Sequence, residues 1–126
     1  MDQINAVYQG NFDSLDNIQV SPLSRAYTFS DSVYEVVPFF EGTAIGFGEH
    51  LARLQRSANA IDIDIDQSLA SREISQLIES CKFKNGYVYY QVSRGVDQIR
   101  NHIYHNNIEI EYFGYVKNHA FDDQKF

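Results

Sequence analysis

The sequence predicts an α+β fold in which a small antiparallel β-sheet carries two helices packed on one face. Segments rich in β-branched and aromatic residues stand near both ends of the chain, and two stretches with helical spacing lie between them. The order of strands, helices and strands is typical of α+β domains. A length of 126 residues with 44% hydrophobic residues is sufficient for one packed core.

The first strands are expected in two short segments, VYQGNF at residues 7–12 and IQV at residues 18–20. Gln, Gly and Asn at residues 9–11 supply turn chemistry inside the first segment. The polar run SPLSR at residues 21–25 contains a proline and predicts a loop.

A longer strand is expected in VYEVVPFF, residues 33–40, because Val, Tyr and Phe favour extended backbone. Pro38 lacks an N–H group and therefore indicates an edge strand or a bulge. Glu41 and Gly42 predict a turn into TAIGF, residues 43–47, so the two segments are expected to form a hairpin.

Two amphipathic helices are expected, at residues 49–60 and 68–82, because apolar residues recur at intervals of three and four in both stretches. Asp66 or Ser68 is expected to cap the second helix. Cys81 is the single cysteine, so no internal disulfide or Cys-based zinc site can be built, and it is interpreted as a small core residue.

The remaining strands are expected in GYVYYQVS, residues 86–93, and IEIEYFGYV, residues 108–116. The second segment alternates well enough to be the antiparallel partner of the first. Residues 117–126 lose this alternation and turn polar, which predicts an interdomain linker or a tail. The small domain is therefore expected to cover residues 1–116.

Charge and composition argue against several classes of partner. The formal net charge of -7 and the pI near 4.9 would repel the phosphates of nucleic acid. No apolar run reaches the roughly 20 residues that a membrane helix needs, and the opening residues lack the basic and apolar regions of a signal peptide. A cytoplasmic protein without a nucleic-acid or membrane partner is expected.

Two segments resemble metal sites only superficially. In IDIDID, residues 61–66, the aspartates and Glu73 have calcium-loop spacing, but Gln67 stands where such loops need glycine. The isoleucines instead favour an extended segment with one apolar and one solvated face. In RNHIYH, residues 100–105, two histidines without a nearby acidic cluster are a weak zinc signal. No metal site is expected.

Several polar residues are candidates for binding an anion or substrate. Arg100 and His102 stand two residues apart and can converge on a carboxylate, for which a guanidinium offers a planar fork. An exposed polar loop fits the same spacing. Arg53 equally fits a solvated surface arginine, and Tyr34 and Tyr89 equally fit packed strand tyrosines. The residue pattern alone leaves these alternatives open.

Three segments, in order, resemble the small domain of class IV aminotransferases, the fold-type IV pyridoxal-phosphate enzymes. SRAYTFSDSVYEVVPFFEG resembles the family's Arg-Gly-Tyr-x-Phe-Gly-Asp-Gly-Val-Tyr-Glu strand, and EHLARLQRSA resembles its Glu-His-x-x-Arg-Leu-x-x-Ser helix. YVYYQVSRGVDQIRNH resembles its Gln-Val-Thr-Arg-Gly strand with a following Arg-x-His. The resemblance runs from about Val7 to Val116. The Arg-x-His pair favours the D-amino-acid aminotransferase branch over branched-chain aminotransferases and aminodeoxychorismate lyases.

The resemblance implies roles for individual residues. Arg53 matches the arginine that binds the cofactor phosphate in this family. Tyr34, Arg100 and His102 match the group that holds the substrate α-carboxylate in D-amino-acid aminotransferases, the last two reaching across from the partner subunit of a homodimer. Two further residues match positions that line the substrate pocket, Val36 and Tyr89.

The chain departs from the family pattern in its first and third segments. Family glycines are replaced by Ala26, Ser30 and Ser32, so a backbone position that prefers glycine is expected to adjust. One additional residue stands between Gly95 and Arg100, which alters the expected reach of the Arg-x-His pair.

The family's Schiff-base lysine has no match in this chain. Family enzymes hold pyridoxal phosphate through a lysine of a larger C-terminal domain, which is expected to be absent here. The lysines present lie outside any matching motif; they are Lys82, Lys84, Lys117 and Lys125. No catalytic residue is therefore expected in this chain.

The resemblance implies an enzyme that transfers an amino group between a D-amino acid and a 2-oxo acid, with pyridoxal phosphate as its cofactor. The chain alone is expected to be inactive and not to retain the cofactor by itself. The alternative is a non-catalytic binding or interaction module that kept the fold.

Overall fold

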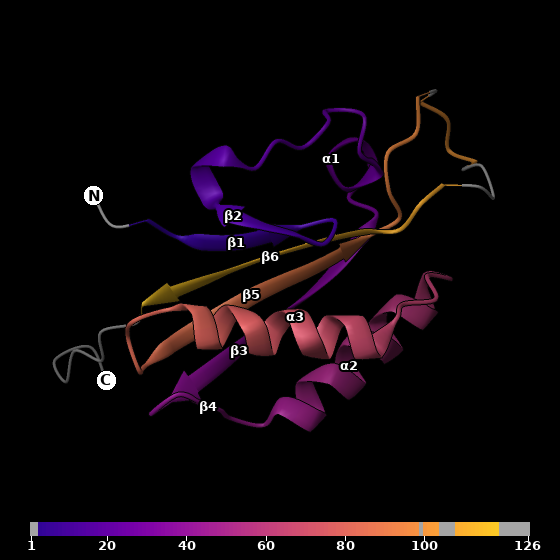
Figure 1. The fold of residues 1–126 in the computed structure, drawn as a ribbon. Helices are drawn as coiled ribbons and strands as arrows, with labels where there is room; N and C mark the ends of the chain where they lie inside the picture. Colours follow the sequence, from indigo (N-terminus) through magenta and orange to yellow (C-terminus); the bar gives the residue numbers. More distant parts are fainter. Residues whose placement is uncertain (1–2, 99, 104–107, 119–126) are drawn as a thin grey trace, which may run out of the picture.

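The computed structural model describes residues 3–98, 100–103 and 108–118. Six strands form one antiparallel sheet in the order β2-β1-β6-β5-β3-β4 (Figure 1). The strands are β1 (Asn5–Tyr8), β2 (Asn11–Ser14), β3 (Ser32–Phe40), β4 (Thr43–Ala44), β5 (Gly86–Ser93) and β6 (Glu111–Asn118). Helices α2 (Phe47–Ala60) and α3 (Gln67–Ser80) lie on one side of the sheet, which confirms the predicted α+β fold.

The predicted loop at residues 21–25 runs into a short helix, α1 (Arg25–Phe29). The Ser24 hydroxyl accepts a hydrogen bond from the N–H of Ala26 and so caps this helix. The strand predicted at residues 18–20 is wrong: these residues form no helix or strand and follow a 3-10 turn, η1 (Leu15–Asn17). Elements this short contain too few residues to show a period.

Two tight turns confirm the expected hairpins. Gln9 and Gly10 both have positive φ between β1 and β2, and Glu41 and Gly42 do the same between β3 and β4. Positive φ at both central residues defines the type I′ turn, whose twist suits two-residue hairpins. The edge strand or bulge expected at Pro38 is not seen, because β3 pairs with β5 in regular register and β4 is the edge strand. The proline is tolerated because β4 pairs only with Phe39 and Phe40, so Pro38 itself has no β4 partner.

The two long helices lie within two residues of their predicted bounds. The Asp66 carboxylate accepts the N–H of Leu69 and caps α3 as expected. Between the helices, Ile63 and Ile65 are buried whereas the neighbouring aspartates are exposed, so the segment has the predicted apolar and solvated faces. Among the described residues no helix is long and apolar enough to cross a membrane.

The core fills the space between the helices and one face of the sheet. Fully buried residues of β3 and β5, such as Val37 and Val88, meet Leu54 of α2 and Leu77 of α3. Cys81 packs at the margin of this cluster, directly after α3. At the other end of the chain, β6 extends to Asn118, two residues beyond the predicted strand.

Candidate functional site

A buried carboxylate on β3 holds an exposed arginine of α2. Glu35 and Val37 stand two positions apart in β3, so both side chains face the helices. Glu35 is only 5% exposed. Nε of Arg53 donates to its Oε2, and Nη2 donates to its Oε1, each at 2.8 Å. Nδ1 of His50, one helical turn before Arg53, lies 2.6 Å from the same Oε1. The Arg53 side chain remains 60% exposed, so its orientation is fixed while its outer edge faces solvent.

The charges of this group support one another. Burial by itself raises the pKa of Glu35, but the hydrogen bonds from Arg53 and His50 outweigh burial, and the net pKa is lowered. The carboxylate in turn raises the pKa of Arg53. Glu35 uses two of the five N–H groups of the guanidinium, so within the described residues the remaining ones are available to an anion such as a phosphate.

The opposite face of the sheet presents a row of tyrosines. The rings of Tyr34 and Tyr89 stack with centroids 5.3 Å apart, and Tyr89 stacks at 5.3 Å on Tyr115 of β6. Val36 is the direct cross-strand neighbour of Tyr89 and is 40% exposed. Alternation along β3 therefore places Tyr34 and Val36 on this face, while Glu35 between them points to the helices.

Arg100 and His102 lie in the segment after β5 and gather around one phenylalanine of α1. The guanidinium carbon of Arg100 is 4.6 Å from the centroid of the Phe29 ring, and the His102 ring meets the same ring edge-on at 5.2 Å. Both polar side chains are exposed. The structure thus brings this pair together on the Phe29 ring, and both the anion-binding and the exposed-loop interpretations stay open.

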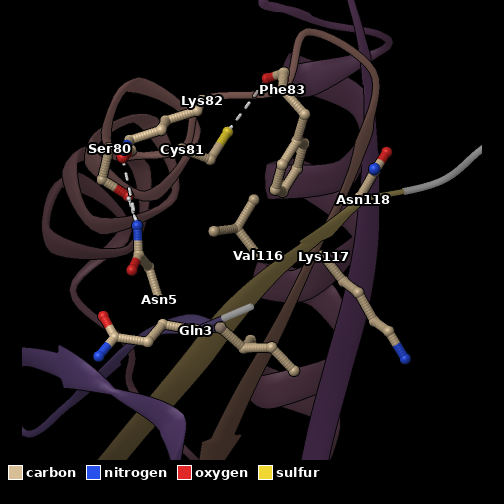
Figure 2. A pocket seen from close by; sticks show the side chains of 10 residues that line it. Gln3, Asn5, Ser80, Cys81, Lys82, Phe83, Val116, Lys117 and Asn118 are labelled. Atoms are coloured by element: carbon tan, nitrogen blue, oxygen red, sulfur yellow. Dashed lines mark hydrogen bonds between the residues drawn. The ribbon is translucent and has the colours of Figure 1, made fainter. Parts of the chain in front are cut away.

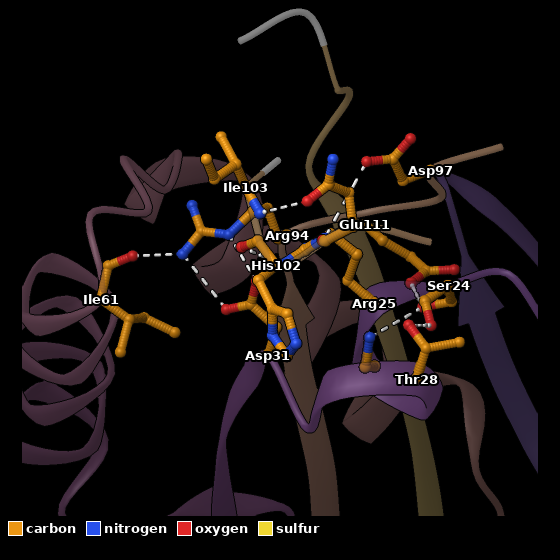
Figure 3. Close-up of polar contacts among 12 residues, drawn as sticks. Ser24, Arg25, Thr28, Asp31, Ile61, Arg94, Asp97, His102, Ile103 and Glu111 are labelled. Atoms are coloured by element: carbon orange, nitrogen blue, oxygen red, sulfur yellow. Dashed lines mark hydrogen bonds and ion pairs between the residues drawn. The ribbon is translucent and has the colours of Figure 1, made fainter. Parts of the chain in front are cut away.

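A group of buried and partly buried ions holds the backbone of this segment (Figure 3). Asp31 accepts from Nε of Arg25 at 3.1 Å and from Nε of Arg94 at 2.6 Å. Nη1 of Arg25 also donates to the carbonyl oxygen of Asn101 at 2.6 Å, and Nη2 to that of His102 at 3.3 Å. Arg94 reaches in the other direction to the carbonyl oxygen of Ile61. One carboxylate therefore joins α1, the end of β5 and the segment that carries the candidate anion-binding residues.

The predicted site residues fall into three groups in this chain. Tyr34, Val36 and Tyr89 share the open face of the sheet, and Arg53 stands on the helix side of β3 with Glu35. The third group is the Arg-x-His pair at the end of the sheet where β5 ends. The first two groups are supported by β3, whereas the Arg-x-His pair is supported by α1.

Sequence reasoning missed the carboxylates and arginines that orient these groups. Glu35 had a usable signal, because a charged residue at an inward position of an alternating strand needs a buried partner. No comparable signal marked the ion pairs of Asp31. Its pair with Arg94 joins residues 63 positions apart, and its pair with Arg25 spans α1, a helix that the sequence did not predict. Within the described residues there is no cluster of three or more His, Cys, Asp or Glu able to hold a metal ion.

A groove of about 620 Å³ lies at the other end of the sheet and contains none of the predicted site residues (Figure 2). Ile4, Phe83 and Val116 contribute its apolar lining, and Cys81 borders it. The Cys81 thiol donates to the carbonyl oxygens of Ile78 and Phe83, and burial raises its pKa. The thiol is therefore held in its neutral, less reactive form.

Comparisons with known proteins identify relatives of this chain. The model of the family "Amino-transferase class IV" matches residues 32–125. D-alanine aminotransferase of Listeria monocytogenes is 40% identical over 91 residues, which cover 69% of this chain and 31% of that protein. D-alanine aminotransferase of Staphylococcus aureus is 36% identical over 95 residues, covering 74% and 33%. The chain thus spans about a third of the length of these curated relatives.

Solved structures share the fold at low sequence identity. A branched-chain aminotransferase of Thermoproteus uzoniensis superposes with a TM-score of 0.80 at 16% identity, over 94% of this chain and 42% of that one. A 4-amino-4-deoxychorismate lyase of Pseudomonas aeruginosa gives 0.75 at 18% identity, over 86% and 38%. The matched family model covers most of the chain, it includes the second and third motifs and the later part of the first, and the fold agrees. The chain therefore belongs to the class IV aminotransferase family.

Proposed function

We propose that this chain is the small domain of a pyridoxal-phosphate-dependent D-amino-acid aminotransferase, which moves an amino group between a D-amino acid and a 2-oxo acid. The curated relatives are D-alanine aminotransferases, and they support this branch of the family. The domain contributes anion-binding side chains, whereas the lysine that holds the cofactor belongs to a part of the enzyme outside this chain. Of the linker predicted at residues 117–126, Lys117 and Asn118 belong to β6. Residues 119–126 lie outside the part of the chain that the structure describes and are proposed to form the link to the part that holds the cofactor.

The observation that carries the proposal is the pair of Arg53 and Glu35. A buried carboxylate fixes the direction of an exposed guanidinium and leaves N–H groups directed outward. That arrangement suits a phosphate, because a guanidinium fork matches its oxygens and a fixed fork loses little entropy on binding. When bound, pyridoxal phosphate supplies the electron sink for amino-group transfer. Arg53 binds and orients its phosphate, and Glu35 keeps Arg53 in place.

The substrate is proposed to lie on the tyrosine side of β3. Tyr34 offers a hydroxyl to the substrate carboxylate, and Val36 and Tyr89 supply apolar surface beside it. Arg100 and His102 of the partner subunit complete the carboxylate site in a homodimer. A guanidinium and an imidazole there counter the charge of the carboxylate and set its orientation.

Cofactor binding tests the first part of this proposal. The complete gene product that carries this chain should bind pyridoxal phosphate, and borohydride should fix the cofactor to it. Arg53→Gln should raise the dissociation constant about tenfold or more, because one charge-assisted contact to phosphate is lost. Arg56→Gln changes an exposed arginine of the same helix and is the matched control. Equal affinities of the two variants would remove Arg53 from the phosphate site.

Steady-state kinetics with D-alanine test the second part. Arg100→Ala should raise KM strongly, by about tenfold or more, because a charged contact to the carboxylate is removed. Arg72→Ala, at an exposed position of α3, is the control. An unchanged KM in Arg100→Ala would exclude this residue from the substrate site.

A further inference from the structure

The geometry points to Arg25 as a positioning residue that sets how Arg100 and His102 are presented to a substrate carboxylate. This inference rests on the proposed function, in which those two side chains bind the carboxylate. It assigns a role to an arginine that itself is only 4% exposed and contacts backbone, not ligand.

The guanidinium of Arg25 forms hydrogen bonds with the backbone of the segment that carries Arg100 and His102. Two of its nitrogens donate to consecutive carbonyl oxygens, those of Asn101 and His102, at 2.6 and 3.3 Å. The third, Nε, donates to Asp31 at 3.1 Å, and a carboxylate oxygen of Asp97 lies 3.9 Å from Nη1. A planar fork fixed at its base by a carboxylate defines the direction of the two peptide groups it holds.

The Phe29 ring also links Arg25 to the side chains of Arg100 and His102. The guanidinium carbon of Arg25 lies 4.2 Å from the ring centroid, and that of Arg100 lies 4.6 Å from it. The His102 ring touches the edge of Phe29. Arg25 therefore meets the backbone of the segment directly and meets its side chains through one shared ring.

The base of this assembly is rigid. Asp31 binds Arg94 through two nitrogens, at 2.6 and 3.1 Å, so the carboxylate that holds Arg25 is fixed to the end of β5. The backbone N–H of Arg25 donates to Gly95 and that of Asp97 donates to Leu23, which ties α1 to the residues that follow β5.

A lysine cannot replace this arginine. An ammonium group keeps the charge but lacks the planar fork, so it cannot hold Asp31 and two successive carbonyl oxygens at once. Arg25→Lys should therefore loosen the segment while retaining the local charge. Arg56→Lys makes the same replacement at an exposed position of α2 and serves as the matched control.

The first measurement follows the segment in the 126-residue chain by NMR. Arg25→Lys should speed hydrogen exchange at the amides of Asp97 and Ile103 and shift the His102 ring signals, because the ring loses its place against Phe29. Arg56→Lys should leave these signals unchanged. Phe29→Leu gives a second route if Arg25→Lys does not fold, and it should shift the His102 ring signals as well. Unchanged signals in a folded variant would overturn the inference.

The second measurement uses the complete enzyme with D-alanine. Arg25→Lys should raise KM about tenfold with a smaller change in kcat, because carboxylate binding weakens while the chemical step is untouched. An unchanged KM in Arg25→Lys, with a raised KM in Arg100→Ala, would overturn the inference and leave the proposed function standing. An unchanged KM in Arg100→Ala would instead refute the proposed carboxylate site itself.

Discussion

Two arginine–carboxylate groups flank β3 and are arranged in opposite ways. At Glu35 the carboxylate is buried and Arg53 is exposed, so the pair directs a charged fork outward. At Asp31 the carboxylate joins Arg25 and Arg94, and both of these arginines are buried. The first group leaves an arginine exposed to solvent, and the second uses its arginines to hold segments of the chain together.

The difference in exposure separates substitutions that should weaken ligand binding from substitutions that should weaken the fold. A buried ion loses its hydration and must be paired, so breaking the pair is costly to the fold. An exposed arginine remains hydrated, so its replacement affects ligand binding more than folding. Substitutions at Asp31 and at Arg53 should therefore have contrasting effects on stability and on binding.

The largest effect is expected from Asp31→Asn. The change removes the negative charge that faces Arg25 and Arg94, and the free energy of unfolding should fall by about 3 kcal/mol or more. Urea denaturation measures this value. Asp16→Asn, at an exposed position of η1, should change it by no more than about 0.5 kcal/mol. A loss at Asp31 no larger than in this control would show that the two groups do not differ.

A smaller, pH-dependent effect is expected from Glu35→Gln. The folded-state pKa of Glu35 lies below its ordinary value of 4.5, so the ionised group stabilises the fold above that pH. This stabilisation is lost as the pH falls through the lowered pKa. At pH 7 the variant should be less stable than the wild type by about 2 kcal/mol, within the range for hydrogen bonds to charged groups.

The difference between Glu35→Gln and wild type should shrink toward pH 3, measured by denaturation at each pH. The comparison of variant with wild type is needed because Glu73 changes the stability of both proteins with pH in the opposite direction to Glu35. Burial raises the pKa of Glu73, so its contribution is present at low pH and is lost as the pH rises through the raised pKa. A gap that stays constant with pH would mean that Glu35 is not the titrating group.

The smallest effect is expected from Ser30→Gly. Ser30 has a φ of 53° at the end of α1, directly before Asp31. Glycine adopts this conformation without strain, so the variant should be more stable by up to about 1 kcal/mol. Ser32→Gly lies inside β3 and should instead lose about 0.5 to 1 kcal/mol. Thermal unfolding of both variants measures the contrast, and a destabilised Ser30→Gly would contradict it.

Several elements were predictable because their signals are local. β5 has the predicted bounds Gly86–Ser93, and α2 and α3 lie where apolar residues recur at helical intervals. The expected backbone adjustment at a replaced family glycine is not seen at Ser30, which keeps the positive φ that favours glycine. The stacked pair of Tyr34 and Tyr89 shows that residues singled out in different motifs are neighbours. Their roles in binding stay predictions.

By itself, the sequence determined the α+β order of strands and helices, the hairpin turns and the family motifs. Periodicity and turn chemistry depend on residues that are close in the chain, so they can be recognised from the sequence. Only the tertiary structure decided which ions meet. Glu35 of β3 pairs with Arg53 of α2, and Asp31, which binds Arg25, pairs with Arg94 63 positions further along the chain. Burial gives these pairs their strength, and burial exists only once the sheet, the helices and α1 have packed.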